Sequence, residues 1–175
     1  MKTDSQVFMQ LAIYEAKKSP EGSPKVGAII VKEGQVVASA YRGKCGAHLH
    51  AEQCAISEAK EAGIEIKGAK VYTTLEPCNV VKSTAKTPCA NQLIDAGVHE
   101  VCIGSYGRNP AIYRQGWKKL RDAGIKIQDF DALHRQQVID LNRTADGNFL
   151  FSVGFEGGAK FDYMQNGGKF ELYMR

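Results

Sequence analysis

The chain has 175 residues, of which 43% are hydrophobic, 24% charged and 9% aromatic, and its formal net charge is +4. This composition is ordinary for a globular protein and excludes a disordered chain, because there are enough apolar residues to build a buried core. The longest apolar run, residues 26–31, is far shorter than the roughly 20 residues of a membrane-spanning helix, so a membrane span is excluded too. Polar residues interrupt any signal-peptide core near the N-terminus, and we expect a cytoplasmic protein.

Hydrophobic periodicity and turn residues predict an alternation of helices and strands up to residue 142. Asp4 or Ser5 is expected to cap the first helix, and Glu33-Gly34 between two β-rich runs predicts a hairpin. We expect helices over residues 6–18, 50–61, 88–96, 117–123 and 132–142, and strands over residues 26–32, 35–41, 70–74, 99–104 and 125–127. Such an alternation predicts a layered α/β fold whose later strands are parallel.

The pattern changes after Asp146, where aromatic and apolar residues alternate with others. This alternation predicts two or three extra strands, two of which are joined by a tight turn at Asn166-Gly167-Gly168. No linker-like segment precedes them. We therefore expect residues 1–145 to form the main part of one domain and residues 146–175 to be a β extension of it.

Five cysteines are an odd number at low density, which is unlike a disulfide scaffold. Cys78 and Cys89 each follow a proline, and His50-Ala51-Glu52 lies upstream of both. One imidazole and two thiolates suit Zn²⁺, with the fourth tetrahedral position left for water or hydroxide, as in a catalytic site. His50 and Glu52 point about 200° apart on a helix, so they are expected to have different roles. The pattern therefore predicts one zinc ion per chain and leaves Glu52 free to act on the bound water.

Helix signals support this arrangement. Thr87 can cap a helix whose first residue is Pro88, which places Cys89 in the first turn, where free N–H groups and the helix dipole favour a thiolate. The alternatives are a structural zinc site completed by Cys45 or His48, and a chance arrangement without metal. The remaining cysteines, Cys54 and Cys102, are expected to be buried apolar fillers.

The order His-x-Glu, Pro-Cys and a second Cys resembles the signature of zinc deaminases. Ten residues separate the two cysteines here, where the compact signature has two. With that longer loop, the chain resembles the deaminase family of riboflavin biosynthesis, over roughly residues 5–128. The resemblance rests on residues 23–27, 71–78, 87–89, 93–98, 109–110 and 120–125.

This resemblance implies a three-layer α/β/α fold of the cytidine deaminase type, with a mixed central sheet. It also implies hydrolytic deamination of a phosphorylated aminopyrimidine, with release of ammonia, in a homodimer or homotetramer. Residue by residue, His50, Cys78 and Cys89 fall on the zinc ligands and Glu52 falls on the proton shuttle. Gly22-Ser23 stands where the family usually has Pro-Asn, and the loop between the cysteines lacks the His-rich bacterial pattern.

Four residues are candidate substrate contacts: Ser23, Lys82, Lys86 and Asn109. The two lysines, with Ser83 and Thr84 beside them, have the chemistry to bind a substrate phosphate, and so has Arg42 or Lys44 ahead of His50. The alternative is that these are solvated surface charges. Two other functions remain open. One is deamination of a base in tRNA or single-stranded DNA, with phosphate contacts from Lys82, Lys86, Lys118, Lys119 and Arg121. The other is a catalytically silent zinc-containing binding module that uses the C-terminal strands to contact a partner.

Overall fold

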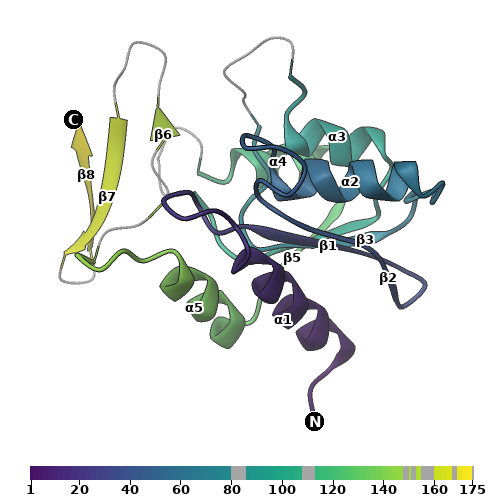
Figure 1. The fold of residues 1–175 in the computed structure, drawn as a ribbon, viewed down its shortest axis with the longest axis horizontal. Coiled ribbons are helices and arrows are strands. Elements are labelled where there is room, and N and C mark those ends of the chain that lie inside the picture. The colour runs from purple at the N-terminus through teal and green to yellow at the C-terminus, as the bar shows by residue number, and fades with distance from the viewer. Residues whose placement is uncertain are drawn as a thin grey trace.

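The computed structural model describes residues 1–79, 86–107, 113–147 and 150, together with the backbone of residues 153–154, 160–166 and 169–174. These residues form a mixed five-stranded sheet with helices on both faces (Figure 1). The sheet consists of β1 (Gly27–Lys32), β2 (Gln35–Tyr41), β3 (Lys70–Thr73), β4 (Glu100–Ile103) and β5 (Lys126–Asp129). The helices are α1 (Asp4–Ala16), α2 (Ala51–Glu61), α3 (Cys89–Asp95), α4 (Gln115–Asp122) and α5 (Ala132–Leu141).

The strand order is β2-β1-β3-β4-β5. Strand β1 pairs antiparallel with β2 and β3, whereas β3, β4 and β5 pair in parallel. The predicted hairpin, the mixed sheet and the parallel later strands are therefore confirmed.

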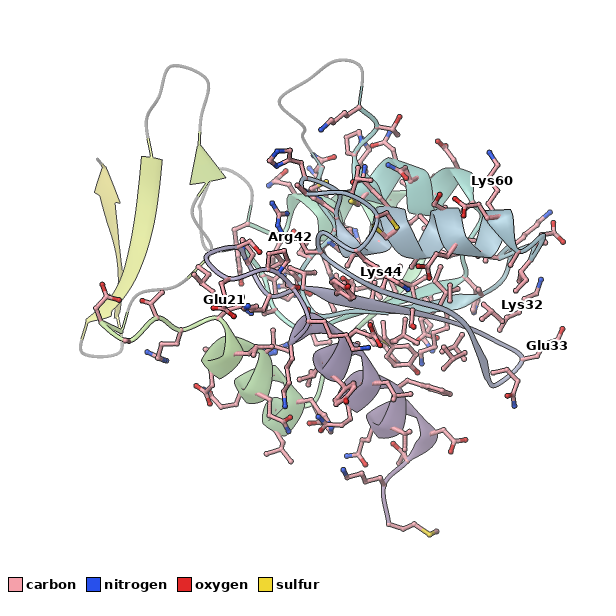
Figure 2. All side chains as sticks on the ribbon, in the orientation of Figure 1. Glu21, Lys32, Glu33, Arg42, Lys44 and Lys60 are labelled. Atoms are coloured by element: carbon pink, nitrogen blue, oxygen red, sulfur yellow. The ribbon has the colours of Figure 1, made fainter. Side chains whose placement is uncertain are left out.

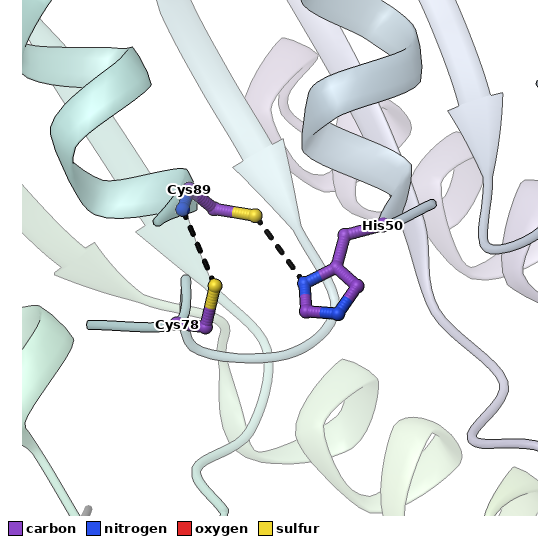
Figure 3. A group of neighbouring side chains, drawn as sticks. All are labelled: His50, Cys78 and Cys89. Atoms are coloured by element: carbon purple, nitrogen blue, oxygen red, sulfur yellow. Dashed lines mark hydrogen bonds between the residues drawn. The ribbon is translucent and has the colours of Figure 1, made fainter. Parts of the chain in front are cut away.

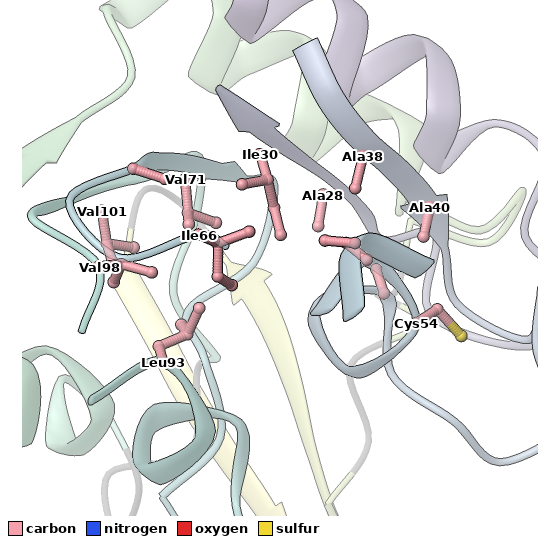
Figure 4. Close-up of a cluster of buried hydrophobic side chains, with 14 of the residues drawn as sticks. Ala28, Ile30, Ala38, Ala40, Cys54, Ile66, Val71, Leu93, Val98 and Val101 are labelled. Carbon is pink, nitrogen blue, oxygen red and sulfur yellow. The ribbon is translucent and has the colours of Figure 1, made fainter. Parts of the chain in front are cut away.

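Side chains of β1 alternate between the two faces of the sheet, as the two-residue period of a strand requires. Ala28 and Ile30 belong to the hydrophobic cluster beneath α2, α3 and α4, part of which is drawn in Figure 4. Ile29 and Val31 belong to a second cluster, which contains residues of α1 and α5. The near-continuous apolar sequence of β1 follows from burial on both faces, and it produces the three layers of the fold.

Several predicted boundaries were wrong by a few residues, and for α1 the reason is its local capping. Thr3, not Asp4 or Ser5, caps α1: its side chain accepts a hydrogen bond from the Gln6 amide, and the Gln6 side chain accepts one from the Thr3 amide. Helix α3 begins at Cys89 with Pro88 as its cap residue, so Thr87 is not the cap. Helix α4 begins at residue 115 instead of 117, and β5 ends at residue 129 instead of 127.

A fully buried amide joins the end of α5 to the segment that enters β1. Asn142 Oδ1 accepts a hydrogen bond from the Lys25 amide at 2.7 Å, and Asn142 Nδ2 donates one to the Lys25 carbonyl at 3.1 Å. The pair fixes the backbone of Lys25 as a neighbouring strand would. Ser23 lies two residues before Lys25, so the Asn142–Lys25 hydrogen bonds also restrain the segment that contains Ser23.

The C-terminal residues form a second sheet of β6 (Val153–Gly154), β7 (Lys160–Asn166) and β8 (Lys169–Met174). Asn166 pairs with Lys169 across β7 and β8, so two residues connect the strands, as the turn sequence predicted. The extra strands are confirmed, whereas the division of the domain at residue 145 stays a prediction. None of the helices in the described part of the chain has the length and apolar character that crossing a membrane requires.

Candidate metal centre and active site

The structure brings His50, Cys78 and Cys89 together (Figure 3). One possible ligand atom from each lies within 4.8 Å of the other two. Cys89 Sγ is 3.3 Å from His50 Nδ1, and Cys78 Sγ accepts a hydrogen bond from the Cys89 amide at 3.2 Å. A nitrogen and two sulfur donors at this spacing fit the ligand chemistry and tetrahedral geometry of Zn²⁺.

These three residues meet because their elements begin or end at one edge of the sheet. His50 is the cap residue of α2, Cys78 follows the carboxyl end of β3, and Cys89 is the first residue of α3. The Ala90 amide also donates a hydrogen bond to the Cys78 carbonyl at 3.1 Å. The first turn of α3 therefore holds both the sulfur and the backbone of Cys78, although ten residues separate the cysteines.

The electrostatics of the three clustered side chains favour one thiolate. The hydrogen bond with Cys89, and then the nearby His50, lower the pKa of the Cys78 thiol to about 4, although burial acts in the opposite direction. Cys78 and burial together raise the pKa of the Cys89 thiol. The hydrogen bond with Cys78 raises the pKa of His50. Zinc binds thiolates and neutral imidazole, so it competes with protons at Cys89 and His50, and its affinity depends on pH.

Glu52 is buried beside this cluster, with only 3% of its surface exposed. Its Oε1 atom accepts a hydrogen bond from Thr73 Oγ1 at 3.1 Å. Burial raises the pKa of the Glu52 carboxyl, against the opposing effect of His50. Glu52 is not among the clustered ligand atoms of the described residues, so it is separate from the candidate ligand set. A buried carboxyl of raised pKa is suited to accepting and returning a proton.

Two residues near the cluster were not found from the sequence. The Glu76 carboxylate accepts a hydrogen bond from the Gly116 amide at 3.2 Å and so joins the Cys78 segment to the start of α4. Burial raises the pKa of Glu76 to about 7. Thr73 is fully buried between Glu52 and the Leu75 carbonyl. Their roles depend on contacts between distant segments, and the only signal in the sequence is their closeness to Cys78.

The predicted substrate contacts are only partly described. The Ser23 hydroxyl donates a hydrogen bond to the Pro20 carbonyl at 2.8 Å and closes a turn. Lys86 is exposed and lines an open groove between α2 and α3, together with Leu49 and Gln53. Lys82 and Asn109 lie outside the described residues.

The other cysteines do not complete the metal cluster. Among the residues that the structure describes, neither Cys45 nor His48 belongs to it, so these residues do not form the closed four-ligand alternative. Cys54 and Cys102 are buried in the two hydrophobic clusters, as the filler interpretation predicted. Burial raises the pKa of each of these thiols to about 12, which keeps them protonated.

Comparison with known proteins gives the family. Residues 2–105 match the family described as the cytidine and deoxycytidylate deaminase zinc-binding region, and the chain belongs to this family. The match confirms the fold class and the zinc cofactor predicted from the sequence.

The relatives include riboflavin biosynthesis proteins. The chain is 39% identical over 123 residues to riboflavin biosynthesis protein RibD of Aquifex aeolicus, a match that covers 69% of this chain and 33% of the relative. It is 35% identical over 130 residues to the chloroplastic riboflavin biosynthesis protein PYRD of Arabidopsis thaliana, covering 73% of this chain and 29% of the relative. The matches thus span about a third of these longer proteins.

Solved structures agree with this assignment. A diaminohydroxyphosphoribosylaminopyrimidine deaminase/5-amino-6-(5-phosphoribosylamino)uracil reductase from Thermotoga maritima matches with a TM-score of 0.70 and 32% identity, over 79% of this chain and 39% of that one. The dCMP deaminase of cyanophage S-TIM5 matches with a TM-score of 0.60 and 25% identity, over 74% of this chain and all of the phage protein.

Proposed function

We propose that this chain is a zinc-dependent hydrolytic deaminase of a phosphorylated aminopyrimidine of the riboflavin-pathway type, which releases ammonia. In this proposal His50, Cys78 and Cys89 hold one zinc ion and Glu52 transfers protons. The observation that carries it is a buried carboxyl, Glu52, beside a His-Cys-Cys cluster. The names of the riboflavin biosynthesis relatives support the choice of substrate.

When bound, zinc supplies the Lewis acidity that makes water a nucleophile near neutral pH. Glu52 accepts a proton from the attacking water and delivers it to the ring nitrogen next to the reacting carbon. The same carboxyl then assists departure of the amino group as ammonia. The Thr73 hydroxyl, 3.1 Å from Glu52 Oε1, fixes the orientation of the carboxyl during both transfers.

The test is ammonia release by the zinc-loaded protein with the diaminopyrimidine phosphoribosyl and phosphoribityl compounds, with Glu52→Gln as the matched variant. We expect release from one of the two compounds and at least a hundredfold lower kcat in Glu52→Gln, because general acid–base catalysis contributes about 10²–10⁴. Zinc content should be the same in both proteins. Near-normal activity in Glu52→Gln would refute the role of Glu52. No release from either compound by a fully zinc-loaded wild type would refute the substrate class.

The nucleic-acid alternative has less support. Arg121, one of the cations it requires, forms an ion pair with Asp122 at 2.8 Å and stacks on the Trp117 ring. A steep salt dependence of RNA or DNA binding would favour it. A zinc-loaded wild type as inactive as Glu52→Gln on every aminated ring would instead favour the silent binding module. We also propose a homodimer or homotetramer, which sedimentation velocity tests directly.

A further inference from the structure

Arg42, which follows β2 directly, has a side chain that no described residue neutralises. Its Nε atom is buried and has no hydrogen-bond partner. Arg114 and Arg135 also bury an Nε atom without a partner, but Arg114 stacks on two aromatic rings and Arg135 forms an ion pair with Asp129 at 2.9 Å. Of these three arginines, Arg42 alone has a guanidinium with neither an ion pair nor a ring contact among the described residues.

Backbone contacts place Arg42 at the edge of the metal centre. Its amide donates a hydrogen bond to the Val26 carbonyl at 2.9 Å, and the amide of the next residue, Gly43, donates one to the Leu49 carbonyl at 3.0 Å. These hydrogen bonds place Arg42 between the segment that enters β1 and the residue before His50. Arg42 is labelled in Figure 2. Its positive charge also opposes protonation of His50 and so acts to lower the pKa of that imidazole.

A buried N–H group without a partner has lost its hydration without a compensating hydrogen bond. Such groups are rare in folded proteins, and beside an active site a ligand is the natural partner. A guanidinium matches the geometry of a phosphate, because its planar N–H groups can donate two parallel hydrogen bonds to two phosphate oxygens. We propose that Arg42 binds the phosphate group of the substrate, an inference that rests on the proposed function for the presence of a phosphate ester.

Lys44 provides a matched comparison, because it carries the same charge two residues further along the chain. Its ammonium group forms an ion pair with Glu58 and donates a hydrogen bond to the Ser39 carbonyl at 2.8 Å. The charge of Lys44 is therefore already compensated by the protein, whereas that of Arg42 is not. A phosphate ligand should depend on Arg42 and not on Lys44.

The first experiment measures binding of ribose 5-phosphate to the zinc-loaded protein by calorimetry, for the wild type, Arg42→Gln and Lys44→Gln. We expect Arg42→Gln to weaken binding at least tenfold, in line with the strength of charge-assisted hydrogen bonds, and Lys44→Gln to change it less than twofold. Zinc content and Tm are recorded for each protein to exclude misfolding. No binding by the wild type, wild-type affinity in Arg42→Gln, or equal weakening in both variants would overturn the assignment.

The second experiment measures deamination kinetics with the phosphorylated substrate and its dephosphorylated form. Arg42→Gln should raise KM for the phosphorylated compound at least tenfold with little change in kcat, and it should leave KM for the dephosphorylated compound unchanged. An equal rise in both KM values would overturn the phosphate assignment. Binding of ribose 5-phosphate requires no deamination. Arg42-dependent binding without ammonia release would therefore refute the proposed reaction alone, whereas ammonia release without Arg42-dependent binding would refute the Arg42 assignment alone.

Discussion

Replacing Gly116 with alanine should damage the metal centre from a distance. A Cβ atom at this position would lie 2.0 Å from the Pro77 carbonyl oxygen, where real Cβ atoms essentially never approach within 3.0 Å. The backbone of Pro77 and the start of α4 must therefore separate by about 1 Å. Pro77 directly precedes Cys78, and the same movement strains the hydrogen bond from the Gly116 amide to Glu76. The displacement is thus transmitted to a candidate zinc ligand.

The magnitude follows from the cost of overpacking, about 1–3 kcal/mol. For a chain of this length each kcal/mol lowers Tm by roughly 2–4 °C, so Gly116→Ala should lower Tm by about 2–12 °C. Zinc affinity should also fall about 10–100-fold, as it does when groups that support metal ligands are displaced. Calorimetric Tm measurement and competition of zinc against a chelator measure the two effects separately.

Gly27→Ala is the matched control. Its Cβ atom would lie 2.1 Å from the Ala12 carbonyl oxygen, a clash of similar severity that is directed against α1 and not against the Cys78 segment. We expect a comparable fall in Tm with zinc affinity changed less than about threefold, because the ligands are not displaced. Unchanged zinc affinity in Gly116→Ala, or equal losses of affinity in the two variants, would refute the reasoning.

Two further predictions concern Glu52, the proposed proton shuttle, and the cap of α5. Thr73→Val preserves the shape of the side chain but removes the hydrogen bond to Glu52, so kcat for ammonia release should fall about tenfold or more. Thr73→Ser keeps the hydroxyl and should retain most of the wild-type kcat. Equal kcat values in the two variants would contradict this role of Thr73. The amide and then the imidazole of His134 lower the pKa of Asp131 to about 2, so this carboxylate contributes stability above its unfolded pKa of about 3.9 and loses it as the pH falls toward 2. Asp131→Ala should therefore lower the Tm measured by circular dichroism by a few degrees at pH 6 and by less at pH 3. A difference in Tm between wild type and variant that does not shrink at pH 3 would contradict the stabilising role of the Asp131 carboxylate.

The sequence was sufficient to predict the order of elements and the candidate metal-binding residues that the structure brings together. The side chains of β1 alternate between two faces because strand geometry repeats every two residues, and the turn at Glu33-Gly34 depends on the residue types in the turn itself. Both patterns are local and can be predicted from the sequence. The His50, Cys78 and Cys89 set was recognisable because few side-chain combinations suit Zn²⁺. The ends of the helices and strands were predicted less accurately than their order. The cap at Thr3 became evident only from its reciprocal hydrogen bonds with Gln6.

The tertiary structure decided the contacts that join segments distant in the chain. Asn142 binds the backbone of Lys25 across 117 positions, and Gly116 packs against Pro77 without room for a methyl group. In the sequence Arg42 and Lys44 are equivalent candidates for binding a phosphate. Only the structure distinguishes them, because Arg42 has a buried Nε atom without a partner whereas Lys44 forms an ion pair with Glu58. Periodicity and residue spacing thus predicted a layered α/β fold and the kind of metal site, because these depend on local geometry and ligand chemistry, and the family resemblance implied the three-layer arrangement. The packing of distant elements decided which contacts position the candidate metal-binding residues. It also decided which positive charge, that of Arg42, has no partner in the described residues and is proposed to bind the substrate.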